Sequence, residues 1–231
     1  MNIQELEARI KTLENQLESQ EKILRTLQDI EEIKKLQRAY GYYLEHWMAQ
    51  EIIDLFSDGP DVSLMLAQGA YSGKEGVIRY FERYKEPSPE FLHQVMQLSG
   101  IVNVDPDGRT ANGRWYGYGA VAVPVDKQVI QRFISGIYGC EYVKENGIWK
   151  IKKLRFDQTY NATPARGWVK PEIAADAALS QGGFAAADIP RTFSPRYPSG
   201  YIFPFPYKHP VTGKETSEGI RNSSIEGVEK Q

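Results

Sequence analysis

Cysteine is almost absent from this chain of 231 residues, in which Cys140 is the single thiol. One cysteine excludes a disulfide framework within the chain and cannot form a cysteine zinc site alone. Histidine is also scarce: His46, His93 and His209 lie far apart and lack the spacing of metal ligands. The sequence has no phosphate-binding glycine loop and no dinucleotide-binding fingerprint. We therefore expect neither a metal nor an organic cofactor.

An excess of charge of one sign is missing as well. The chain carries 28 Lys and Arg against 30 Asp and Glu, a net charge of −2, so we expect neither nucleic acid nor a membrane surface as a partner. No apolar run has the length of a membrane span, and none near the start resembles a signal peptide. These features predict a soluble cytoplasmic protein. Aromatic residues are plentiful, with 14 Tyr and 4 Trp, and suit an aromatic-lined pocket.

Residues 1–29 have the apolar spacing of a coiled-coil helix. The apolar residues follow one another in steps of three and four, and Gln20 takes one position of the series: Ile3, Leu6, Ile10, Leu13, Leu17, Leu24 and Leu27. Two apolar positions in seven make a stripe narrower than a helix on a broad core needs. The alternative is an amphipathic helix that lies on its own domain. The pattern favours an N-terminal arm that takes part in assembly.

A second pattern, from residue 30 to about residue 160, predicts one α+β domain. A wider apolar face continues the helix to Trp47, and short helices are expected at Ala49–Phe56 and Val77–Tyr84. Alternation of period two then predicts four long strands: Leu92–Val104, Ala111–Val123, Gln128–Lys144 and Ile148–Phe156. Turn sequences such as Asn146-Gly147 join them. Helices followed by a meander predict a bent antiparallel sheet wrapped over helices.

Residues 161–231 form a C-terminal extension of different composition. A short helix is expected at Pro171–Leu179, and Arg191–Pro210 is rich in proline and aromatic residues without a helix or strand period. Its aromatic side chains are expected to pack on this domain or on a neighbouring subunit. Residues after Thr212 have the composition of a disordered tail.

Several short motifs, taken in their order, resemble one known family. They are Glu32-Ile33 to Glu45-His46-Trp47, Tyr71-Ser-Gly-Lys-Glu-Gly-Val-Ile78, His93, Asn103-Val-Asp-Pro-Asp-Gly108 and Gly147-Ile-Trp-Lys-Ile151. Over about residues 30–160 the chain resembles the SnoaL-like branch of the nuclear transport factor 2-like superfamily. The resemblance implies a cone of curved sheet closed by helices. The branch includes polyketide cyclases, scytalone dehydratase, bile-acid dehydratase and a dehydrochlorinase.

The resemblance also implies catalytic residues. In the enzymes of this branch a histidine of the first long strand meets an acid of the first helix, and His93 and Glu45 match these positions. A carboxylate on one imidazole nitrogen would raise the basicity of the other. Tyr40 and Tyr116 match positions that stabilise or protonate a developing oxygen. The alternatives are a core histidine for His93, a solvated helix face for Glu45, and ordinary packing for the two tyrosines.

Four further aromatic residues are candidates for substrate contacts: Tyr43, Trp47, Trp115 and Tyr118. Alternation along the second long strand places Tyr116 and Tyr118 on one face and Trp115 with two glycines on the other. Scytalone dehydratase has a second histidine on this strand, which this chain lacks. Space opposite the glycines suits either a strongly bent strand or a flat ligand.

The function expected from these features is a cofactor-independent lyase of the dehydratase type. It would use His93 and Glu45 in acid–base chemistry on a small hydrophobic substrate, aromatic or phenolic, as lignin-derived diaryl compounds are. One alternative is an isomerase or polyketide-type cyclase with the same site. Another is a non-catalytic binding or assembly module whose pocket is filled by its own side chains. We expect a homo-oligomer, with a trimer as first choice and a dimer as second.

Overall fold

The computed structural model describes residues 2–83, 91–125, 128–165, 186–191, 205 and 207–214. The helix predicted at 171–179 lies outside the described residues. So do most of the aromatic segment and nearly all of the predicted tail. Among the helices that are described, none combines the length and the apolar content needed to cross a membrane.

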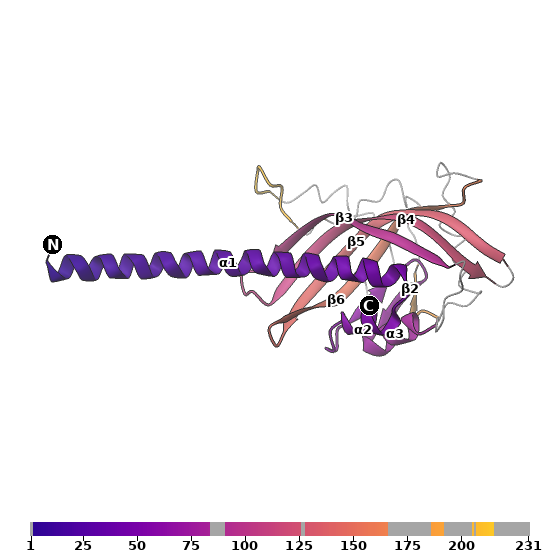
Figure 1. The fold of residues 1–231 in the computed structure, drawn as a ribbon, viewed down its shortest axis with the longest axis horizontal. Helices are drawn as coiled ribbons and strands as arrows, with labels where there is room; N and C mark the ends of the chain where they lie inside the picture. Colours follow the sequence, from indigo (N-terminus) through magenta and orange to yellow (C-terminus); the bar gives the residue numbers. More distant parts are fainter. Residues whose placement is uncertain are drawn as a thin grey trace.

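The long helix α1 runs without a break from Ile3 to Glu45. A capping box starts it: the Asn2 side chain accepts a hydrogen bond from the Glu5 backbone at 2.8 Å, and the Glu5 carboxylate accepts one from the Asn2 backbone at 2.9 Å. The boundary expected near residue 29 is not a break in the helix. It is a change in burial, because Asp29 is the first buried residue. The first half of α1 projects from the body of the molecule as an arm (Figure 1).

A curled, open sheet makes up most of the body, which confirms the predicted α+β class (Figure 1). The described strands occur in the order β3-β4-β5-β6-β1-β2-β7, and the long strands β3 to β6 pair antiparallel. The elements after α1 are α2 Ala49–Asp54, β1 Ser63–Met65, β2 Gly69–Ser72, α3 Gly73–Phe81, β3 Leu92–Val104, β4 Thr110–Val125, β5 Gln128–Glu145, β6 Ile148–Ala162 and β7 Ile189–Pro190.

Element bounds match the expected ones most closely where the alternation is strong. Strand β3 has the predicted ends, whereas β6 runs six residues past the predicted Phe156. The apolar alternation did not predict this extension, because two of its buried residues, Asp157 and Asn161, have polar side chains. Pairing with β5 holds the extension, as in the pair Ala162 and Phe133. Tertiary pairing therefore decided the end of β6.

Polar contacts fix α1 against the sheet. The buried Asp29 carboxylate accepts hydrogen bonds from Trp149 Nε1 at 2.9 Å and from the Lys144 ammonium. Two turns further on, the fully buried Gln37 accepts a bond from the Tyr142 hydroxyl at 2.7 Å and donates one to Gln97 Oε1 at 2.9 Å. Buried polar groups need such partners, so these contacts fix both the rotation and the position of α1.

The Asp29 contacts predict a large effect of mutation. In Asp29→Ala the Lys144 and Trp149 donors lose their acceptor inside the protein, and we expect the free energy of unfolding to fall by about 3 kcal/mol. The control is Glu21→Ala, which removes an exposed ion pair with Arg25 on the arm and should cost at most about 0.5 kcal/mol. Urea unfolding followed by tryptophan fluorescence measures both. Equal losses in the two variants would contradict this account of how α1 is held.

Candidate active site

His93 lies on the inner face of the sheet at one end of β3. It has the same parity along the strand as the buried Val95, and its ring packs against two aromatic rings. The ring centroids of Trp47 and Phe91 are 5.5 Å and 6.3 Å from that of His93, and the Phe91 ring is stacked at 19°. The imidazole is therefore held between aromatic side chains from two segments of the chain.

The Nδ1 atom of His93 is buried and has no hydrogen-bond partner among the described residues. Burial lowers the pKa of His93 to about 4, and the positive charge of Arg83 acts in the same direction. The imidazole is therefore neutral near pH 7. A buried nitrogen without a partner costs free energy, so a bound ligand or water that accepts or donates a hydrogen bond there would stabilise the protein.

The residues beside His93 form an aromatic box with a cation at its edge. Trp47 comes directly after α1 with a positive φ of 50°, and its Nε1 donates to the Phe81 carbonyl at 2.8 Å. The guanidinium of Arg83 lies 4.3 Å from the Trp47 ring centre and 3.9 Å from that of Tyr80. Such stacking holds a guanidinium in place without neutralising its charge. Of these residues, sequence reasoning identified Trp47 alone.

A second cation shares the inner face with His93. Strand pairing places His93 opposite Val121 on β4, and Val121 opposite Arg132 on β5. The three residues form one row across the sheet, so His93 and Arg132 lie about 10 Å apart at the backbone, the width of two strand spacings. Arg132 is buried and donates to Asn161 Oδ1 at 3.3 Å. The alternation along β5 predicts that Arg132 lies on the inner face of the sheet. Only the pairing register shows that it lies in the same row as His93.

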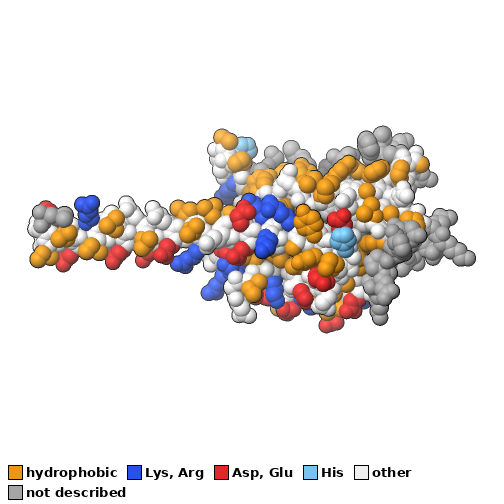
Figure 2. Space-filling view, viewed as in Figure 1, with side chains coloured by type: hydrophobic (Ala, Val, Ile, Leu, Met, Phe, Trp, Pro, Cys, Tyr) orange, Lys and Arg blue, Asp and Glu red, His pale blue; other side chains and the backbone are white. Residues whose placement is uncertain are grey.

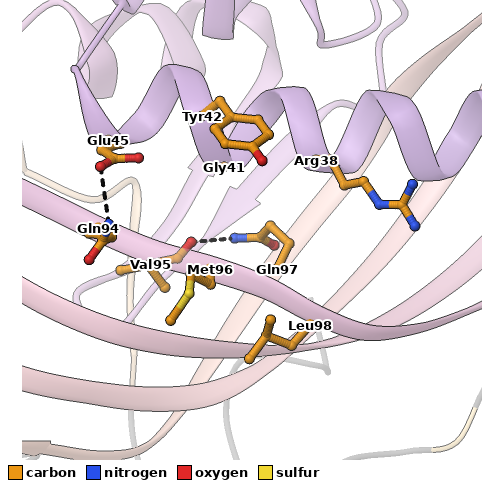
Figure 3. A pocket seen from close by; sticks show the side chains of 9 residues that line it. All are labelled: Arg38, Gly41, Tyr42, Glu45, Gln94, Val95, Met96, Gln97 and Leu98. Atoms are coloured by element: carbon orange, nitrogen blue, oxygen red, sulfur yellow. Dashed lines mark hydrogen bonds between the residues drawn. The ribbon is translucent and has the colours of Figure 1, made fainter.

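Glu45 is placed differently from the expectation. Its carboxylate accepts a hydrogen bond from Gln94 Nε2 at 3.2 Å, and Gln94 is directed to the opposite side of β3 from His93. Both line an open groove of about 370 Å³ between α1 and β3, together with Arg38, Gly41 and Tyr42 (Figure 3). The expected bond between Glu45 and His93 Nδ1 is not formed, so the acid of the proposed pair does not orient the base.

Tyr40 is buried deep in the core, not at an open surface. Its ring meets the edges of Phe56, Phe81 and Tyr138, with centroid distances of 6.2–6.4 Å. Burial raises the pKa of its hydroxyl well above the ordinary value, so the phenol stays protonated. Tyr43, three residues on, is partly buried against the same core. The structure thus places Tyr40 in the aromatic core as a neutral phenol.

The outer face of the sheet carries two of the predicted site residues. Tyr116 is 53% exposed and Tyr118 is 46% exposed, whereas Trp115 of the same strand is buried on the other face. The predicted alternation is present, but its two tyrosines are directed away from His93. Because a strand separates its two faces completely, neither tyrosine reaches a substrate held at His93 of the same chain.

Side chains of the chain itself fill the half of the cone away from His93. Trp115 Nε1 donates to the Tyr142 hydroxyl at 3.0 Å, which in turn donates to Gln37. The rings of Tyr138 and Phe156 stack at 4.2 Å in the space opposite Gly117. Gly113 and Gly117 of β4 thus make room for aromatic side chains, and not for a ligand at this point, while Gly119 allows the close approach of the Gln94 backbone.

The burial of His93 predicts a pH dependence of stability. Its pKa is about 4 in the folded protein and about 6.5 when unfolded, so only the unfolded state gains a proton as the pH falls between these values. The contribution to stability is complete above pH 6.5, and we expect a loss of about 2 kcal/mol on going from pH 7 to pH 5. Urea unfolding at the two pH values should show this loss in wild type and in the exposed control His46→Gln, but not in His93→Gln.

Comparison with known proteins identifies the family and the fold of this chain. A SnoaL-like domain model matches residues 25–155, while no curated protein sequence matches the chain. Among solved structures, a protein of unknown function from Mycobacterium tuberculosis is 15% identical over 72% of this chain and 96% of its own, with a TM-score of 0.51. The LinA structure is 18% identical over 65% of this chain and 99% of its own chain, with a TM-score of 0.50.

Identities this low show the fold and no more. The family model extends over more than half of the chain, from the end of the arm to the middle of β6. The chain therefore belongs to the SnoaL-like domain family, and its body has the fold of the solved structures named above.

Proposed function

We propose that this protein is a cofactor-independent lyase of the dehydratase or elimination type that acts on a small hydrophobic substrate, aromatic or phenolic. One observation carries the proposal: a neutral imidazole beside two aromatic rings has a buried Nδ1 atom without a hydrogen-bond partner among the described residues. A substrate atom that binds there supplies the missing partner. The rings of Trp47 and Phe91 make the surroundings of His93 apolar, which suits a hydrophobic substrate.

The chemistry assigned to His93 is proton transfer. A nitrogen lone pair of the neutral imidazole takes a proton from a substrate carbon, the electrons of the C–H bond form a double bond, and the leaving group departs with its own electron pair. The imidazolium then returns this proton to the leaving group. The pKa of about 4 keeps this imidazole neutral and able to accept a proton near pH 7, and negative charge that develops on a substrate beside it would raise that pKa.

Two guanidinium groups are placed to balance that negative charge. Arg83 borders the aromatic box, and Arg132 lies in the same row across the sheet as His93. In this proposal they take the part expected of Tyr116, because fixed cations stabilise a developing oxyanion or phenolate. Tyr40 remains behind the box as a neutral phenol.

The test begins with a thermal-shift screen of small phenolic and diaryl compounds, followed by assays of turnover for those that bind. We expect His93→Gln to keep its fold and lose roughly 10²–10⁴-fold in turnover, because the proton-transfer group is gone. The matched control is Tyr116→Phe, on the outer face, which should change turnover less than about twofold. Full activity of His93→Gln would refute the role of His93.

A second candidate function has its own observation. The cone is largely filled by Trp115, Tyr142 and the Gln37 contacts, which is what a non-catalytic assembly module predicts. If no compound in the screen stabilises the wild type, and His93→Gln is less stable than wild type at pH 7, His93 is a core residue and the assembly module is the better description.

A further inference from the structure

Helix α1 has two apolar faces that lie on roughly opposite sides. The face buried in the body contains Ile33, Gln37, Tyr40 and Leu44. At about 100° per residue, the apolar series of the arm is centred about 180° away from this face. We call that series the seam: Ile3, Leu6, Ile10, Leu13, Leu17, Gln20, Leu24 and Leu27. The arm is therefore not an amphipathic helix lying on its own domain.

The seam is open to solvent along its length. Its apolar residues are between 41% and 75% exposed, and Figure 2 shows hydrophobic side chains repeated along the projecting arm with acidic ones beside them. A regular stripe of large aliphatic residues on an isolated helix is a surface for a partner. Helices of this length are weak alone, so the arm gains stability when the seam is covered.

We infer that the seam pairs with the same seam of a second copy of this chain in a parallel, in-register, two-stranded coiled coil over Ile3–Leu27. The spacing assigns Ile3, Ile10, Leu17 and Leu24 to position a of the heptad, and Leu6, Leu13, Gln20 and Leu27 to position d. Ile at position a with Leu at position d favours two strands, and position d of the seam holds no β-branched residue.

The flanking charges select the parallel direction. Position e holds Glu7, Glu14 and Glu21, and position g holds Arg9, Gln16 and Ile23. In a parallel pair, position g of one helix faces position e of the next heptad in the other, which brings Arg9 to Glu14 of the second copy. In an antiparallel pair, e faces e, and rows of glutamate would oppose each other. Charge complementarity thus argues for the parallel pair.

Two polar features fix the register of the parallel coiled coil and the residue at which it ends. Gln20 meets Gln20 of the second copy only in register, where the two amides can bond to each other. After Leu27 the next two seam positions are Glu31 and Lys34, which form an ion pair within the same helix at 2.6 Å. The apolar seam therefore stops before Asp29 and the buried part of α1, and the two bodies separate there.

The oligomeric state of the full chain tests the pairing. Light scattering after gel filtration should give twice the chain mass for wild type and the single mass for a double variant with Leu13→Glu and Leu17→Glu. The matched control places the same two charges off the seam, Asn15→Glu and Ser19→Glu, and should stay a dimer. Far-UV circular dichroism and the thermal midpoint check that the body stays folded, as it should because these side chains are exposed.

Cross-linking tests direction and register. Under mild oxidation, Gln20→Cys should form a disulfide between two copies, whereas Ser19→Cys, directed away from the seam, should not. A mixture of Gln20→Cys and Ile10→Cys that cross-links in preference to either alone would indicate an antiparallel pair and overturn the proposal. A wild-type monomer, a trimer, or a dimer that survives the two seam glutamates would overturn it as well. Turnover plays no part in these readouts, so their outcome is independent of the proposed lyase.

Discussion

The Gln37 side chain is fully buried between α1 and the sheet, with Tyr142 and Gln97 as hydrogen-bond partners. A buried amide left without partners costs several kcal/mol in an apolar surrounding, so the helix has one rotation at which this residue is satisfied. Asp29, two turns earlier, requires the same rotation through Trp149 and Lys144. The fold depends on this alignment, because α1 supplies the central layer on which the sheet curls.

The same rotation decides what each side of α1 can do. With Gln37, Tyr40 and Leu44 facing the sheet, Glu45 is turned one helical step of about 100° out of the core. It therefore reaches Gln94 in the groove and not His93. The seam of the arm is turned outward by the same geometry, which leaves it for a partner. A single set of polar contacts thus separates the His93 end of the cone from the assembly surface.

Much of the fold was predictable from local pattern. Strong alternation gave β3 its ends, and the turn Asn146-Gly147 marked the hairpin between β5 and β6, where Asn146 has a positive φ. The arm was predictable because aliphatic residues in steps of three and four need no tertiary partner to be recognised. The extension of β6 was not, because Asp157 and Asn161 are polar residues buried by neighbours distant in sequence.

The sequence by itself determined the α+β class, the two patterns along α1 and the face of β4 on which each aromatic residue lies, since these follow from spacing along one segment. The family came from the resemblance of several motifs in their order. The tertiary structure alone decided which side chains meet. It brought Arg83, Trp47 and Phe91 to His93, aligned Arg132 with it across two strands, and kept Glu45 away. The physical reason is that strand register and helix rotation are set by burying polar groups such as Gln37 with their partners, and those partners lie far apart in the sequence.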